Sequence, residues 1–124
     1  MTSLRILIAD DNDAVRRRVI RLLSSQADWQ ICGEARDGSE AVEKGRELLP
    51  DLILLDISVP GMSGLEAARL LRQELPAAKI IVISQHDPKQ MLPQVLQAGG
   101  DGCVDKGKLG AELVESIKKM HPAA

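Results

Sequence analysis

Short apolar runs alternate with amphipathic segments along this chain. The runs are rich in Ile, Leu and Val, which is typical of strands buried in a sheet. They cover residues 4–9, 30–35, 51–56, 79–84 and 101–105. The runs at 51–56 and 79–84 are almost continuously apolar, as is expected of parallel strands that helices cover on both faces. The pattern therefore predicts five strands in a parallel sheet.

The segments between these runs repeat apolar residues at helical spacing, so that each presents one apolar face. The sets are Val15, Val19, Leu22 and Leu23; Ala41, Val42, Gly45, Leu48 and Leu49; Leu65, Ala68, Leu71 and Leu75; and Leu113, Val114, Ile117 and Met120 in a last helix from about Lys108. Ser63 and Glu66 form a capping-box pattern before the third helix. Strands that alternate with helices predict an α/β fold, a single doubly wound (βα)5 domain.

The fourth helix is expected to be irregular. Asp87 and Pro88 have the pattern of an N-cap and a first helical residue, but Pro93 lies about five residues further on. A proline inside a helix removes a hydrogen bond and costs about 3 kcal/mol. We therefore expect this helix to begin late, near Met91 to Pro93, or to be kinked.

Composition excludes several classes of protein. The 124 residues carry 16 basic and 18 acidic side chains, so nothing indicates a surface for polyanions and we expect no direct contact with nucleic acid. The chain lacks Phe and Tyr, which makes stacking on bases improbable. Its apolar runs are too short for a membrane span, and residues 1–3 lead into a strand without a signal peptide. We expect a cytoplasmic protein without membrane contact.

Polar residues follow four of the predicted strands. They are Asp10 and Asp11 after the first, Asp56 after the third, Ser84 after the fourth and Lys106 after the fifth. Each has an ordinary explanation, since Asp caps helices and turns, Ser satisfies backbone groups and Lys is commonly solvated. Their joint placement matters more, because functional groups of such sheets collect beyond the carboxyl ends of the strands.

This cluster predicts metal-assisted phosphoryl chemistry. Carboxylates in close proximity repel one another unless a cation neutralises them, and Mg2+ prefers oxygen ligands. We expect Asp11 and Asp56 to bind Mg2+ directly and Asp10 to bind it through water. A free oxygen of ionised Asp56 could then attack a phosphoryl group. Lys106 and Ser84 would supply a cation and a hydrogen-bond donor to the transferred group.

Four segments carry a resemblance to a known family. They are IADDND at the first strand, DLILLDISVPGMSGLE around the third, IVIS at the fourth and AGGDGCVDK at the fifth. Together they resemble a response regulator receiver domain, the CheY-like module of two-component signalling, over residues 1–120. The resemblance implies a flavodoxin-like sheet of order 2-1-3-4-5 and is strongest to the branch that usually carries a LuxR-type helix-turn-helix. Residues 121–124 would begin a linker or C-terminal tail.

The resemblance also implies a role for each residue of the cluster. Asp56 would be the phosphoacceptor, Asp10 and Asp11 the metal-binding acidic pair, and the main-chain carbonyl of Ser58 a further Mg2+ ligand. Lys106 would contact the phosphoryl oxygens, and Ser84 would be the hydroxyl that moves to bond the new phosphate. The face formed by the fourth helix, fifth strand and fifth helix would then rearrange.

The implied partners are a sensor histidine kinase or a phosphotransfer protein. In this family they dock on the first helix, where the sequence places a basic cluster. The cluster comprises Arg16, Arg17, Arg18 and Arg21. Taken alone, such a cluster is most often a solvated helix face. Receivers of this kind often form homodimers, but no residue identifies the helices that would pair.

Cys103 departs from the family pattern, because the position commonly holds the Tyr or Phe that swings inward when the hydroxyl moves. Signalling could run through backbone and helix displacement alone, or Cys103 could have a redox role. We favour the first, since an isolated strand cysteine is usually a small hydrophobe. A disulfide to Cys32 is excluded by the implied strand order, because bridged Cα atoms must lie within about 7 Å.

Two other functions are weighed against a signalling switch that catalyses its own phosphorylation and dephosphorylation. A Mg2+-dependent phosphatase of the haloacid dehalogenase type also uses an aspartate nucleophile at a strand end. That family requires a second Asp two residues later, where this chain has Ser58. A degenerate receiver would act as a constitutive interaction module; the complete acidic cluster argues against it, while Cys103 keeps it open.

Overall fold

Strands and helices alternate along the chain in the computed structural model, which describes residues 3–58 and 61–121. The strands are β1 (Leu4–Ala9), β2 (Trp29–Ala35), β3 (Leu52–Asp56), β4 (Lys79–Ser84) and β5 (Gly102–Asp105). The α-helices are α1 (Asp13–Ser24), α2 (Gly38–Leu48), α3 (Gly64–Glu74), α4 (Pro88–Gln97) and α5 (Leu109–Met120), with a 3-10 turn at Lys106–Lys108. The parallel sheet has the order β2-β1-β3-β4-β5, which confirms the predicted fold class.

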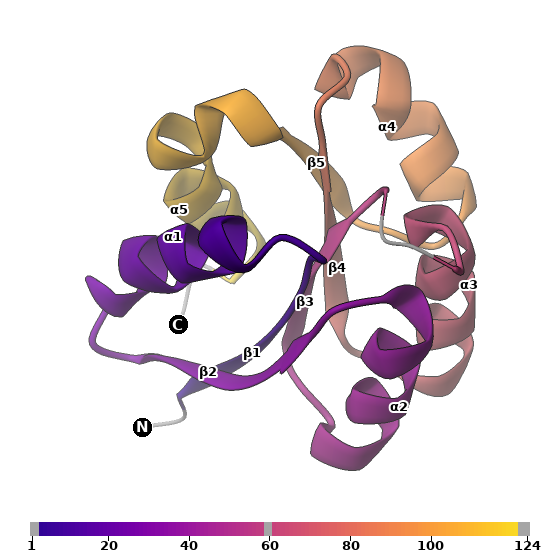
Figure 1. Cartoon of the computed structure of the whole chain (residues 1–124), viewed down its shortest axis with the longest axis horizontal. Coiled ribbons are helices and arrows are strands. Elements are labelled where there is room, and N and C mark those ends of the chain that lie inside the picture. The colour runs from indigo at the N-terminus through magenta and orange to yellow at the C-terminus, as the bar shows by residue number, and fades with distance from the viewer. Residues whose placement is uncertain (1–2, 59–60, 122–124) are drawn as a thin grey trace.

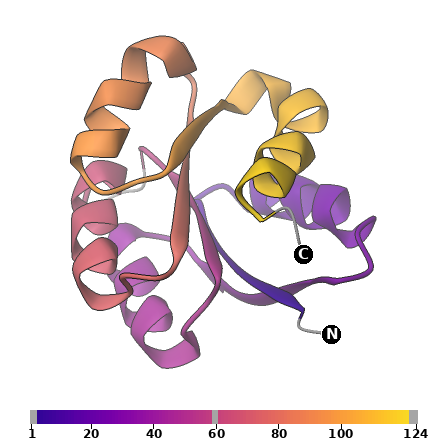
Figure 2. The same ribbon diagram turned by 180° about the vertical axis from the view of Figure 1, so that it is seen from behind.

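Helices cover both faces of this sheet (Figures 1 and 2). Because side chains alternate along a strand, Ile6 and Ile8 pack in one core with α1 and α5. Leu7 and Ala9 pack in the other core with α2 and α3. Burial on both faces explains why the central strands are apolar without interruption. The polar residues at the strand ends lie beyond these two cores.

The start of α4 differs from our expectation, because the helix begins at Pro88 and the predicted late start near Met91 to Pro93 is wrong. The Asp87 side chain accepts a hydrogen bond of 3.0 Å from the Lys89 amide, and its main-chain carbonyl accepts bonds from Gln90 and Met91. Pro93 lies inside the helix on its solvent-exposed side. Water can therefore bond the carbonyl that Pro93 leaves without an amide, while the N-cap stabilises the first turn.

The two cysteines lie at opposite edges of the sheet, Cys32 on β2 and Cys103 on β5. Both are free thiols, which confirms that they do not pair. None of the helices that the structure describes is long and apolar enough to cross a membrane. The predicted linker or tail at 121–124 lies outside the described residues except for His121.

His121 follows α5 and gives a pH-dependent prediction. Burial lowers the pKa of its imidazole below 6.5, and the charge of Lys79 lowers it further, against the opposing effect of Asp51 and Asp101. Its Nε2 is buried without a hydrogen-bond partner among the described residues. Unfolded chains therefore bind a proton at a higher pH than the folded protein does, so stability is lost as the pH falls below 6.5.

We expect His121→Gln to reduce this loss. The measurement is the free energy of urea unfolding of both proteins between pH 8 and pH 5, roughly the range over which histidine titrates. The difference between the two curves isolates residue 121, because the other titrating groups are shared. Parallel curves would contradict the assignment.

Candidate functional site

The acidic cluster forms because β1 and β3 are parallel neighbours in the sheet. Asp10 follows β1 directly and Asp56 is the last residue of β3, so their side chains emerge at the same edge. Carboxylate oxygens of Asp10, Asp11 and Asp56 lie within 4.8 Å of one another. Asp10 and Asp56 are only 3% and 2% exposed, whereas Asp11 is open to solvent. The structure thus brings together the three acids that the sequence singled out.

Lys106 contacts two of these acids from the end of β5, the edge strand of the sheet. Its Nζ lies 3.1 Å from Oδ2 of Asp56 and 3.2 Å from Oδ2 of Asp10. The lysine begins the 3-10 turn after β5, where the Asp105 carboxylate caps the turn by accepting the Gly107 amide at 2.8 Å. This cap sets the direction in which the chain leaves β5. One ammonium therefore bridges two buried carboxylates.

Burial and charge act together on the ionisation of this cluster. The pKa of Asp10 is raised, chiefly by burial and further by the Asp56 charge, although the Asn12 amide and Lys106 oppose the rise. Burial alone would lower the pKa of Lys106, but its bonds and charge interactions with Asp56 and Asp10 together raise it. Lys106 is therefore firmly protonated at neutral pH. The raised pKa of Asp10 means that its ionised form is destabilised at this buried position, and the neighbouring Asp56 charge adds to that effect.

The grouping of these carboxylates fits a divalent cation. Three carboxylates offer hard oxygen donors within a few ångströms of one another, and such donors suit Mg2+. Neither Asp10 nor Asp11 caps the following helix, because Asn12 is the N-cap of α1 and accepts the Val15 amide at 3.1 Å. Asp10 instead accepts the Asn12 amide at 2.9 Å in the turn before the helix.

Ser58 and Ser84 lie beside the acids. The Ser58 hydroxyl is 3.2 Å from Oδ1 and 3.3 Å from Oδ2 of Asp56, and its amide donates to the same carboxylate. The sequence singled out the carbonyl of Ser58 and missed this hydroxyl contact. Ser84 ends β4, is completely buried and accepts the His86 amide at 3.0 Å through its Oγ. Because Asp56 pairs with Ile83 in the sheet, Ser84 lies just beyond it at the same edge.

Arg16 corrects our interpretation of the basic cluster. Arg17, Arg18 and Arg21 are exposed as expected, but Arg16 is 6% exposed. It shares a helix face with Val19 and Leu23, which lie three and seven residues further along and are both buried. This spacing in the sequence could have indicated that Arg16, unlike the other three arginines, faces the protein interior.

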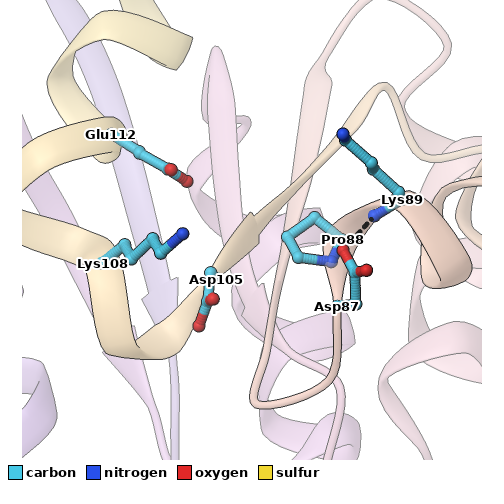
Figure 3. A pocket seen from close by; sticks show the side chains of 6 residues that line it. All are labelled: Asp87, Pro88, Lys89, Asp105, Lys108 and Glu112. Carbon is cyan, nitrogen blue, oxygen red and sulfur yellow. Dashed lines mark hydrogen bonds between the residues drawn. The ribbon is translucent and has the colours of Figure 1, made fainter.

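Two surface hollows lie where the chain leaves β4 and β5. One of ≈ 350 Å³ adjoins Lys106 and is lined by Val15, Gln85, Asp105, Lys106 and Gly107. The other, of ≈ 550 Å³, lies between the start of α4, the end of β5 and the start of α5 (Figure 3). Its lining residues are Asp87, Pro88, Lys89, Asp105, Lys108 and Glu112. The first gives access to the lysine, and the second separates α4 from α5.

Known proteins are similar to this chain in sequence and in fold. The family model of the response regulator receiver domain matches residues 6–118. The response regulator GacA of Pseudomonas viridiflava is 37% identical over 115 residues, which are 93% of this chain and 54% of that protein. The chain thus spans about half the length of the curated relatives it matches.

Solved structures agree with this assignment. A LuxR-family response regulator from Aurantimonas sp. SI85-9A1 has a TM-score of 0.89 and 34% identity, with 96% of this chain and 85% of that chain covered. The receiver domain of the putative response regulator NarL from Mycobacterium tuberculosis has a TM-score of 0.90 and 31% identity over the whole of both chains. The chain therefore belongs to the response regulator receiver domain family of two-component signalling.

Proposed function

We propose that Asp56 accepts a phosphoryl group from a phosphohistidine of a sensor histidine kinase or a phosphotransfer protein. Receiver domains of response regulators interact with such proteins and act as signalling switches. The observation that carries the proposal is the contact of the Lys106 ammonium with the buried carboxylates of Asp10 and Asp56. A reactive carboxylate with a cation already beside it is arranged for transfer of an anionic group.

The chain's own residues perform the transfer in this proposal. An oxygen of Asp56 attacks phosphorus, the P–N bond to the donor histidine breaks with its electron pair leaving on the imidazole, and an acyl phosphate forms on Asp56. Lys106 then contacts the phosphoryl oxygens. When Mg2+ is bound, Asp10, Asp11, Asp56 and the Ser58 carbonyl would hold it. Bound Mg2+ would offset the charge of the acids and of the transferred group. The same groups would assist hydrolysis, in which water attacks phosphorus and releases phosphate.

The conformational switch is proposed to run from Ser84 to α4. A Ser84 side chain that moves toward a phosphate on Asp56 would draw its Oγ away from the His86 amide, from which it accepts a hydrogen bond. His86 directly precedes Asp87, the N-cap of α4, so this change reaches the start of the helix. Among the described helices α4 is weakly anchored, since Val95 is the one buried residue of its ten. Few buried contacts make an element easy to displace.

Cys103 favours displacement over redox chemistry in this proposal. Burial raises the pKa of the Cys103 thiol, and the charge of Asp105 raises it further. A thiol that stays protonated is a poor nucleophile and resists oxidation. We therefore propose that the α4, β5 and α5 face responds through the backbone and α4, without an inward-moving side chain at position 103.

Neither alternative function is favoured. The phosphatase hypothesis is opposed by membership of the receiver family and by Ser58, which stands where a haloacid dehalogenase needs a second aspartate. The degenerate-receiver hypothesis is opposed by the cluster of Asp10, Asp11, Asp56 and Lys106. In our proposal the described residues make no direct contact with nucleic acid, because basic and acidic side chains nearly balance. Homodimer formation stays a proposal.

Intact-protein mass tests the phosphorylation. The protein is incubated with acetyl phosphate and Mg2+, quenched in acid and compared with Asp56→Asn and with a chelator-treated sample. We expect one added phosphoryl group that requires both Asp56 and Mg2+. An adduct that persists in Asp56→Asn would place the acceptor elsewhere, and absence of any adduct despite bound Mg2+ would contradict self-catalysed phosphorylation.

A further inference from the structure

The guanidinium of Arg16 contacts the segment that carries the acidic pair. Nη1 donates to the main-chain carbonyl of Asp10 at 2.5 Å, and Nε donates to Oε1 of Glu34 at 3.1 Å. Nη2 forms an ion pair with Asp13. All three nitrogens of a side chain that is only 8% exposed are therefore bonded. This is a specific arrangement, since a buried arginine with any nitrogen unpaired would be costly.

The carbonyl contact fixes the geometry of both acids. The Asp10 carbonyl belongs to the peptide that joins Asp10 to Asp11, and that peptide is planar. Holding its oxygen therefore orients the start of Asp11 as well as the end of Asp10. Two further hydrogen bonds hold Asp10 in place. The Asp10 amide donates to the Ala35 carbonyl at 3.0 Å, and Asp10 Oδ1 accepts the Asn12 amide at 2.9 Å.

A purely structural role would need fewer of these contacts. The ion pair between Arg16 and Glu34 already joins α1 to β2, and Asp13 is a neighbour one turn away on the same helix. Neither requires the third nitrogen to reach the Asp10 carbonyl. That contact ties the arginine to the one peptide whose two residues both belong to the acidic cluster.

We propose that Arg16 is a positioning residue for the metal site: it holds the Asp10–Asp11 peptide so that both carboxylates face Asp56. The inference rests on the proposed function, because it assumes that these acids bind Mg2+. Removal of a residue that hydrogen-bonds and orients metal ligands typically lowers the metal affinity 10–100-fold. Arg16→Ala should accordingly raise the Mg2+ dissociation constant by about 10-fold or more.

Calorimetric titration of the metal-free protein with Mg2+ measures this constant without any phosphorylation. Arg17→Ala is the matched control, because it removes the same charge from an exposed neighbour on the same helix, and its affinity should be unchanged. Glu34→Gln should lower the melting temperature but keep the Mg2+ affinity, since the carbonyl contact is retained. Arg16→Lys should bind Mg2+ with intermediate affinity, because one ammonium cannot reproduce the planar fork of donors.

The outcomes separate the two levels of the proposal. Wild-type protein that binds no Mg2+ would refute the metal site and the inference together. Wild-type protein that binds Mg2+, with an unchanged constant in Arg16→Ala and only a lower melting temperature, would refute the positioning role alone. If circular dichroism shows that Arg16→Ala is unfolded, Arg16→Lys provides the test. A Mg2+ dissociation constant equal to that of the wild type would overturn the inference, and a raised constant would support it.

Discussion

Replacing Lys106 with methionine is expected to slow phosphorylation of Asp56 by about 100-fold or more, since removal of one preorganised donor to a developing negative charge typically costs 10²–10³ in rate. Methionine keeps the length and the apolar stem of the side chain but removes the ammonium that lies 3.1 Å from Asp56 and 3.2 Å from Asp10. The lost group is the one side-chain cation that contacts both carboxylates among the described residues.

The same substitution should not weaken Mg2+ binding, although it slows phosphorylation. The ammonium competes with the metal for the oxygens of Asp10 and Asp56, so Lys106→Met should bind Mg2+ at least as tightly as the wild type. Phosphorylation by acetyl phosphate is followed by intact mass at saturating Mg2+, and affinity is followed by calorimetry. Lys108→Met is the control, because it removes an equal charge from an exposed side chain two residues further on. A normal rate in Lys106→Met would exclude Lys106 from the transfer.

Most of the fold was predictable because the apolar pattern has two distinct causes. Strands buried on both faces must be apolar throughout, and helices that cover them need one apolar face, so runs such as 52–56 and spaced sets such as Leu113 and Ile117 are both visible in the sequence. Placement of the acids then follows from topology. Parallel neighbours end at the same edge of a sheet, which brings Asp10 close to Asp56 without any knowledge of side-chain contacts.

The features that the sequence did not predict depend on competition between local effects. Pro93 disfavours an interior position, but Asp87 and Pro88 form a strong helix start, and only the exposure of Pro93 decides between them. Asn12 rather than a neighbouring aspartate caps α1, because Asn12 directly precedes the helix and its Oδ1 accepts the Val15 amide. Arg16 was grouped with three exposed arginines, since charge alone does not reveal which member of a cluster faces the protein.

Gly64 couples α3 to β3, the strand that ends at Asp56, through a close backbone approach. It is the first residue of α3, and its amide donates to the Ile57 carbonyl at 2.9 Å. A Cβ added here would lie 2.5 Å from the Ile57 Cα and 2.6 Å from the Asp56 carbonyl oxygen. Both are main-chain atoms that cannot rotate away, so either α3 or the backbone after Asp56 must shift.

We therefore expect Gly64→Ala to lower the free energy of unfolding by about 1–3 kcal/mol, the usual cost of overpacking, although alanine is the better helix former. Gly110→Ala is the matched control in another helix: its nearest contact is Arg18 Nη2 at 3.7 Å, so stability should be unchanged or rise by up to about 1 kcal/mol. Urea unfolding measures both. Displacement of Asp56 should also slow phosphorylation by acetyl phosphate in Gly64→Ala, whereas Gly110→Ala should react normally. Equal stability of the two variants would mean that α3 can move without the Asp56 backbone, and the coupling argued from this contact would be lost.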